Sequence, residues 1–161
     1  MKKTIFMAIV GFAMLATSCS TGTKVVQFTE LKNYFYRNDA PKGDQLLKLT
    51  TQEDFNRYFG EAAYMGKDGE PTKIDFNEDF VIAKVFPESN KSPEISNISL
   101  EKDGKEELIL GYEVKEKSTQ SFTIRPTFQI AVSRKYINDN LKGATKLQYW
   151  VRQVYILVHL F

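Results

Sequence analysis

Apolar and polar residues alternate most regularly in the segment 122–132, which predicts a strand with one buried face and one wetted face. The apolar positions are Phe122, Ile124, Phe128, Ile130 and Val132, and the polar positions are Thr123, Arg125, Thr127 and Gln129. Pro126 falls in the apolar set and cannot donate a hydrogen bond to a neighbouring strand. We therefore expect an edge strand, or a strand that is bent at Arg125–Pro126.

A nearly continuous apolar run, Phe80–Phe86, predicts a central strand that is covered on both faces. A further strand is expected at Gln45–Leu49. Alternation also predicts a hairpin with the arms Ile95–Leu100 and Leu108–Val114. Its turn contains Asp103-Gly104, a pair that supplies the positive φ of tight hairpin turns. The polar stretch Pro87–Pro93, which precedes the hairpin, is expected to be a loop.

One short helix is predicted between the expected strands Gln45–Leu49 and Phe80–Phe86. Three aromatic residues would share its apolar face: Phe55, Tyr58 and Phe59. Thr50 or Thr51 would cap its amino end, because an acidic residue follows three positions after each of them. Gly60 would end it.

The segments before this helix are less regular. Val25–Phe28 predicts a short strand, Leu31–Tyr36 fits either a helix or a strand, and Asn38–Asp44 is a turn cluster. Together the elements predict an α+β fold, a mainly antiparallel sheet with one short helix packed on a face. The length suits a single domain over residues 25–161, with its core at about 30–136.

The segment 147–161 is strongly apolar and ends in a run whose only polar residue is His159. It is too short to cross a bilayer as a helix, and its β-branched and aromatic residues favour a strand packed on the core. Two alternatives are an altered carboxyl end without a designed role and a tail that contacts lipid.

The first eighteen residues have the three parts of a secretory leader. Lys2 and Lys3 are followed by the apolar run Ile5–Leu15 and by small residues up to Ser18. The only cysteine, Cys19, comes directly after them. The alternative is an ordinary secretory signal that is cut near Ser18 and leaves a free thiol.

The segment Leu15-Ala16-Thr17-Ser18-Cys19 resembles the lipobox of bacterial lipoproteins. It departs from the family's pattern in having Ala16, rather than leucine, three residues before the cysteine. The resemblance implies cleavage between Ser18 and Cys19, a lipid group on the Cys19 sulfur, and an acyl chain such as palmitate on the new amino terminus. Several acyl chains make membrane attachment effectively permanent.

Residues 19–24 would then form a lipidated polar tether for a domain in the cell envelope. The inner-membrane retention signal of that family, an Asp after the cysteine, is absent. The resemblance therefore implies the outer membrane, and we expect the domain to face the periplasm.

Composition excludes several classes of function. Two of the 22 Lys and Arg residues lie in the leader, so the remaining 20 balance the 20 Asp and Glu residues. A neutral domain without a basic stripe is not expected to bind nucleic acid. A single cysteine, committed to lipid, leaves no disulfide.

The sequence predicts no enzyme, cofactor or metal site. His159, the only histidine, is expected to be a packed or peripheral side chain. The acidic groups are expected to be solvated carboxylates beside turns and caps: Glu53-Asp54, Asp75, Glu78-Asp79 and Glu106-Glu107. Arg125 beside Pro126 would mark a binding edge or only solvate a wet face.

A looser resemblance covers about residues 30–136. It rests on Leu46–Phe55, on Ile74–Ala83, and on a hairpin followed by Phe122-Thr123-Ile124-Arg125-Pro126. This order is similar to the protease complex B-like carboxyl domain of bacterial exported proteins and to uncharacterised lipoproteins related to it. The glycines that this family places after the central strand are replaced here by Pro87–Lys91. The resemblance implies a non-catalytic accessory role.

Two functions therefore remain open. The first is a membrane-anchored, non-catalytic binding or accessory domain that acts on another exported protein, such as a peptidase, through a sheet edge or loop. The second is a small-ligand carrier or an unrecognised hydrolase, which would need a concave pocket with converging polar groups.

Overall fold

The computed structural model describes residues 22–63, 66 and 69–145, and these residues form three small sheets and one α-helix. Sheet A has the strand order β1 (Lys24–Val25), β7 (Ser89–Lys102), β8 (Glu107–Ile124) and β10 (Asn140–Thr145). Sheet B has the order β2 (Phe28–Leu31), β9 (Thr127–Ser133), β6 (Asp79–Val85) and β4 (Gln45–Leu49). Sheet C pairs β3 (Tyr34–Tyr36) with β5 (Phe59–Glu61), and α1 spans Gln52–Tyr58. All strand pairs are antiparallel except β8 with β10, so the predicted α+β class with a mainly antiparallel sheet is confirmed.

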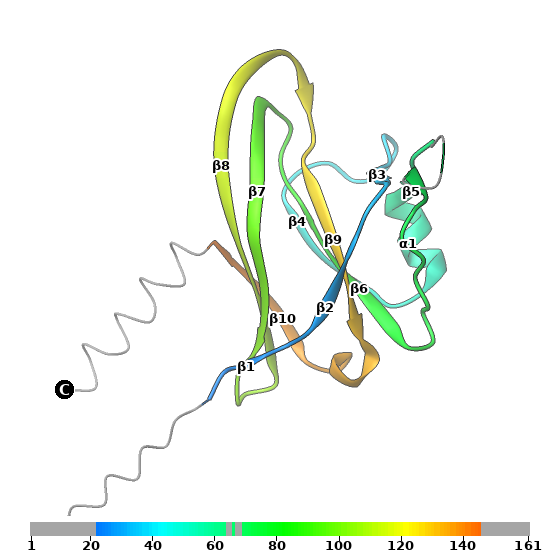
Figure 1. Ribbon diagram of the computed structural model, residues 1–161, viewed down its shortest axis with the longest axis vertical. Coiled ribbons are helices and arrows are strands. Elements are labelled where there is room, and N and C mark those ends of the chain that lie inside the picture. The colour runs from blue at the N-terminus through cyan, green and yellow to red at the C-terminus, as the bar shows by residue number, and fades with distance from the viewer. Residues whose placement is uncertain (1–21, 64–65, 67–68, 146–161) are drawn as a thin grey trace, which may run out of the picture.

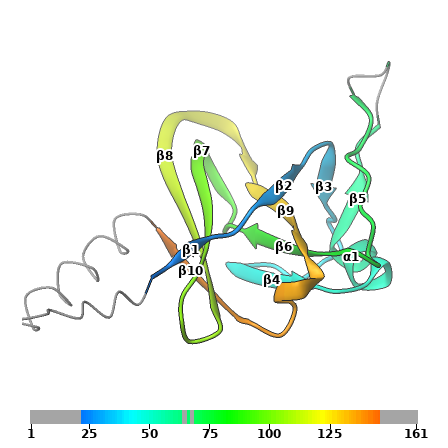
Figure 2. The same ribbon diagram turned by 60° about the horizontal axis from the view of Figure 1, so that its bottom comes forward.

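Sheet B is the middle of three layers (Figures 1 and 2). Its strand β6 pairs with β4 on one side and β9 on the other. Val81, Ala83 and Val85 pack with α1 and sheet C, whereas Phe80 and Ile82 pack with sheet A. All five are buried. The prediction that this strand is central and covered on both faces is therefore confirmed.

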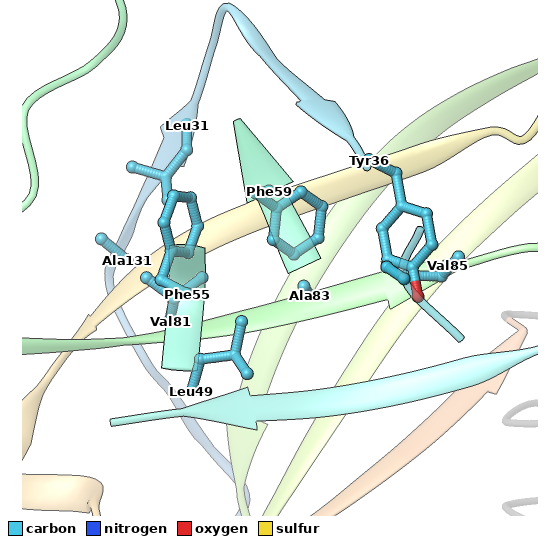
Figure 3. Packing of buried hydrophobic residues seen from close by; sticks show 10 residues of the cluster. Leu31, Tyr36, Leu49, Phe55, Phe59, Val81, Ala83, Val85 and Ala131 are labelled. Atoms are coloured by element: carbon cyan, nitrogen blue, oxygen red, sulfur yellow. The ribbon is translucent and has the colours of Figure 1, made fainter. Parts of the chain in front are cut away.

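The layer on one face of sheet B is made by α1, β3 and β5 (Figure 3). The aromatic rings of this layer pack edge-on and stacked against one another: Tyr34, Tyr36, Phe55 and Phe59. The predicted apolar helix face is thus the one that contacts the sheet, although Tyr58 is only half-buried.

The other face of sheet B packs against sheet A. Leu100, Leu108 and Leu110 lie opposite Ile82 and Ile130 in one buried cluster. Beyond this cluster the rings of Phe86, Tyr112 and Phe128 contact one another. Two apolar cores thus stabilise the domain, one on each face of sheet B.

The predicted carboxyl end of the helix is wrong. The helix begins as expected, with Thr51 as the N-cap and its side chain accepting a bond from Asp54 N at 3.1 Å. It ends at Tyr58, because Phe59 is already in an extended conformation and starts β5. Gly60 lies within this strand, where it pairs with Phe35 of β3. The helix is therefore stopped by strand pairing and not by a left-handed glycine.

The predicted hairpin is present, but its turn chemistry differs. The positive φ is at Glu106 (59°) and not at Gly104. The Asp103 carboxylate accepts bonds from Lys105 N at 2.9 Å and Glu107 N at 3.2 Å. Asp103 therefore closes the turn with its side chain.

Both arms of the hairpin are longer than predicted. β7 begins at Ser89, so most of the expected loop Pro87–Pro93 is strand. β8 runs to Ile124 and includes residues 122–124, which the alternation places in the following strand. Arg125–Pro126 then joins β8 of sheet A to β9 of sheet B, where the chain crosses between layers (Figure 1).

The prediction of which β9 residues face the core and which face water is only partly confirmed. Ile130 and Val132 are buried in the core shared with sheet A, as the alternation indicated. Gln129, expected to face water, is 4% exposed and lies between Leu31 of β2 and Ala83 of β6. Phe122, expected to be an inward residue of the same strand, lies in β8 and is 58% exposed. The first error arises because the second face of sheet B is also covered.

The amino-terminal predictions are largely confirmed with shifted bounds. The expected strand Val25–Phe28 is divided between two short strands, because β1 ends at Val25 and β2 begins at Phe28. Of the alternatives for Leu31–Tyr36, the structure has strand, because β3 spans Tyr34–Tyr36. The turn cluster Asn38–Asp44 and the strand Gln45–Leu49 are present as predicted.

Candidate functional site

The predicted lipidation and cleavage residues, Cys19 and Ser18, lie outside the described residues, as do His159 and the segment 147–161. The described chain begins just before β1, whose Lys24 pairs with Lys102 at the end of the β7–β8 hairpin. None of the helices in the described part of the chain has the length and apolarity needed to span a bilayer.

Arg125 lies at the crossing between sheets A and B and is largely buried, with a side chain that is 11% exposed. Its guanidinium forms an ion pair with Glu88 and lies 5.6 Å from the centre of the Tyr36 ring. Its Nε is buried without a hydrogen-bond partner among the described residues. The predicted exposed position of Arg125 on a wet face is therefore wrong. Arg125 instead connects the loop after β6 to the aromatic layer.

The hydroxyl of Tyr36, whose ring lies near Arg125, forms two further hydrogen bonds. It donates to Pro41 O at 2.6 Å and accepts from Gln45 Nε2 at 3.0 Å. Burial raises the pKa of Tyr36, and the hydrogen bond from Gln45 and the charge of Arg125 act in the opposite direction. The two hydrogen bonds join the turn cluster to β3 and β3 to β4.

A second polar cluster lies at the opposite end of the sheets, around the buried Asp139. Both of its carboxylate oxygens accept from Lys102 Nζ at 2.8 Å. Its backbone oxygen accepts from Lys48 Nζ at 2.9 Å. Burial lowers the pKa of Lys48, and the charge of Asp139 opposes this effect. The cluster ties the segment before β10 to both sheets.

The acidic pairs singled out in the sequence are not brought together. Glu53 forms an ion pair with Arg57, and Glu107 forms one with Lys142. Asp75 accepts from Asn77 N at 2.9 Å in a turn. The described residues contain no group of His, Cys, Asp and Glu side chains that could hold a metal ion. The three contacts lie within a helix, between two strands and within a turn, respectively.

An exposed two-stranded ribbon, which we call the distal ribbon, consists of Ser89–Ser96 of β7 and Glu113–Ile124 of β8. It continues sheet A beyond Tyr112, which pairs with Thr145, the last described residue of β10, and it curls over toward sheet B (Figures 1 and 2). Two large apolar side chains are exposed on it, Val114 (39%) and Phe122 (58%).

The two outer edges of the distal ribbon differ. β7 contains Pro93, which has no N–H to donate, as is common in edge strands that resist pairing. On β8, residues 113–116 pair continuously with 93–96 and contain no proline. In the described part of the chain no strand pairs with this outer edge of β8.

A hollow of about 510 Å³ lies beside Thr145, the last described residue of the chain. Its lining residues come from three strands: Glu94, Ser96, Tyr112, Glu113, Val114, Lys115 and Thr145. Its two carboxylates have partners, because Glu94 forms an ion pair with Lys117 and Glu113 accepts from Asn97 Nδ2 at 2.7 Å. Arg125 is not among the lining residues.

Sequence reasoning missed the distal ribbon because its first arm is polar, contains Pro93 and follows Pro87, which together indicated a loop. The sequence contained one signal for the exposure of Phe122, because the run 115–121 before it is too polar for a core strand. The distal ribbon, with Arg125 at its base, is the candidate interaction site.

Comparison with known proteins found no matching family, no matching curated protein and no matching solved structure. The resemblances to bacterial lipoproteins and to the protease complex B-like carboxyl domain stay predictions.

Proposed function

We propose that the chain is a lipoprotein of the cell envelope, anchored through Cys19, whose domain binds another exported protein without catalysing a reaction. The anchor follows from the leader and the lipobox-like segment. The outer membrane is inferred from the absence of an Asp after Cys19, and the periplasmic face from the absence of an acidic run after it.

The observation that carries the binding role is the position of the distal ribbon relative to the tether. Lys24 pairs with Lys102 next to the hairpin turn, and the distal ribbon lies at the other end of sheet A (Figure 1). A chain of five residues from Cys19 to Lys24 reaches at most about 17 Å. A domain held this close to the bilayer would keep its hairpin turn near the membrane and present the distal ribbon away from it.

The chemistry of the distal ribbon suits a protein partner. An exposed phenylalanine among polar strand residues offers apolar contact area with a wet rim. Ion pairs such as Lys91 with Glu116 and Lys117 with Glu94 occur along the same surface. Since the charges are mixed, shape and the apolar contact at Phe122 would decide recognition. The partner class that we propose is another exported protein, such as a peptidase.

The test is crosslinking in intact membranes followed by purification of the chain. We expect the natural chain to recover a defined partner, Phe122→Asp to lose it, and Phe35→Asp to keep it. Phe35 is the matched control, because it is 49% exposed and lies on sheet C. Recovery of no partner above background would refute the proposal, and so would equal recovery by both variants while thermal unfolding shows them folded.

A further inference from the structure

Near Phe122 the distal ribbon lacks the regular backbone edge that addition of a partner's strand needs. Between the pairs Ser89–Ile124 and Lys91–Thr119, β7 advances two residues and β8 advances five. β8 is therefore three residues longer than β7 in this stretch, and Phe122 is one of the four β8 residues between the paired positions. A bulge of this kind disrupts the ladder of backbone hydrogen bonds and twists the edge away from further pairing.

The extra residues of β8 make this end of the distal ribbon convex. β8 follows the outside of the curl and β7 follows the inside (Figure 1). Eight residues of β7, 89–96, lie opposite twelve residues of β8, 113–124. The strand on the outside of a bend covers the greater distance, so the surplus residues form its outer surface. A convex surface of this kind fits a hollow on a partner better than it fits a flat sheet edge.

Phe122 is a large apolar side chain that this convex end exposes. It is 58% exposed, and it belongs to neither of the two buried clusters nor to the residues packed against them. Its truncation should therefore change the stability of the domain little. An aromatic ring that adds little to the core, and that an ordered strand holds in place, is typical of an anchor that fills a pocket on a partner.

The convex end carries no charge, and the distal ribbon as a whole has no net charge. The segment 118–124 contains no charged residue. The remainder of the ribbon has three lysines and three glutamates: Lys91, Lys115, Lys117, Glu94, Glu113 and Glu116. Two ion pairs within the ribbon, Lys91 with Glu116 and Lys117 with Glu94, use four of these six side chains. Such a surface does not steer a charged partner toward it.

We propose, on the basis of the function proposed above, that Phe122 inserts as a single aromatic anchor into an uncharged apolar pocket on the exported partner. The partner then adds no strand to the ribbon beside Phe122. Ser121 and Thr123 flank the anchor in the chain, and their hydroxyl groups suit the polar rim of such a pocket. Truncation of an anchor of this kind weakens binding by on the order of tenfold or more.

The experiment identifies the crosslinked partner by mass spectrometry and then measures the affinity of the two purified proteins. Phe122→Ala should weaken binding by about tenfold or more, and Phe122→Leu should weaken it less, because leucine keeps part of the apolar area. Val114→Ala is the matched control, since Val114 is exposed on the same strand but lies outside the bulge. It should change the affinity by less than about twofold. An unchanged urea midpoint shows that each variant is folded.

Two further measurements separate an uncharged pocket from other modes of recognition. Raising the salt concentration from about 0.05 M to about 0.5 M should change the affinity by less than about threefold. Lys117→Glu should have an equally small effect. The photoreactive residue p-benzoylphenylalanine, placed at position 122, should crosslink to an apolar segment of the partner. The same residue at position 115, where the ribbon is regularly paired, should not.

Several outcomes would overturn this mode of recognition. Unchanged binding by Phe122→Ala, or a loss of about tenfold or more at high salt, would show that the ring is not the anchor. A crosslink from position 115 but not from position 122 would indicate strand addition. A crosslink from position 122 to lipid or to a second copy of the chain would replace the exported partner by another occupant.

Failure of the proposed function gives a different result. The natural chain would then recover no partner at all, and the anchor would have nothing to bind. A partner that Phe122→Asp loses, but that high salt also releases, would support the proposed function and overturn the uncharged pocket. A partner that Phe122→Ala loses and that high salt does not release would support both.

Discussion

The double coverage of sheet B predicts that substitutions on the two faces of β6 are both strongly destabilising. Ile82 faces sheet A and Val81 faces α1 and sheet C, and both are 0% exposed. Ile82→Ala removes about three methylene equivalents, or roughly 2.4 kcal/mol of transfer free energy at about 0.8 kcal/mol each. The residual cavity raises the expected loss to about 3–4 kcal/mol. For Val81→Ala the same reasoning gives about 2–3 kcal/mol.

The assay is urea unfolding followed by circular dichroism, with the free energy of unfolding taken from curves of equal slope. Val25→Ala is the control, because Val25 is 72% exposed and its truncation should change stability by less than about 0.5 kcal/mol. A small domain has about 5–15 kcal/mol in total, so both core variants should remain folded. A loss below about 1 kcal/mol for either core variant would show that its face of sheet B is not packed.

Three further predictions concern the helix cap, a tyrosine and the anchor. Thr51→Ala should destabilise the domain by about 1 kcal/mol, because it leaves the N–H of Asp54 without its acceptor. Thr50→Ala is the control and should lower the free energy of unfolding less. Equal losses for the two variants in urea unfolding would contradict the assignment of Thr51 as the cap. Because burial raises the pKa of Tyr36 above 10.0, the unfolded chain loses that proton first, so stability is retained below pH 10 and falls as the pH rises further. Tyr36→Phe should weaken this fall in urea midpoints between pH 8 and pH 11, and an unchanged slope would argue against it. Cys19→Ser should move the chain from the membrane fraction to the soluble fraction, whereas retention in membranes after this change would show that the anchor lies elsewhere.

The parts of the fold that were predictable are those in which one local signal had no competitor. Gln45–Leu49 is apolar between a turn cluster and a helix cap, and it forms β4 with the expected bounds. In Phe80–Phe86 the positions that face the two sides of the strand are both apolar, a pattern that is expected only of a strand covered on both faces. Thr51 and Asp54 have the spacing of an N-cap and its donor, and the structure contains that bond.

The errors occur where a local signal competes with pairing between distant segments. Gly60 was expected to terminate the helix after Phe59, but Phe59 already pairs with β3, so the helix ends at Tyr58, one residue earlier. Pro93 reads as a loop residue, but an edge strand tolerates proline because one side of it needs no donor. Gln129 was expected to face water, but the aromatic layer covers its face of the sheet. Its amide donates to Thr127 Oγ1 at 2.9 Å. None of these pairings is encoded within the segment that it overrides.

The candidate site was predictable only at Arg125, and there for a different reason from the one that the structure gives. Arg beside Pro indicated a break in a single strand, whereas the chain changes sheets at this point and buries the guanidinium against Tyr36 and Glu88. The ion pair with Glu88 joins the end of β8, three residues after Phe122, to the loop after β6. Arg125 would therefore act on partner binding through the position of Phe122, and the exposed strand end, not the arginine, would be the contacting surface.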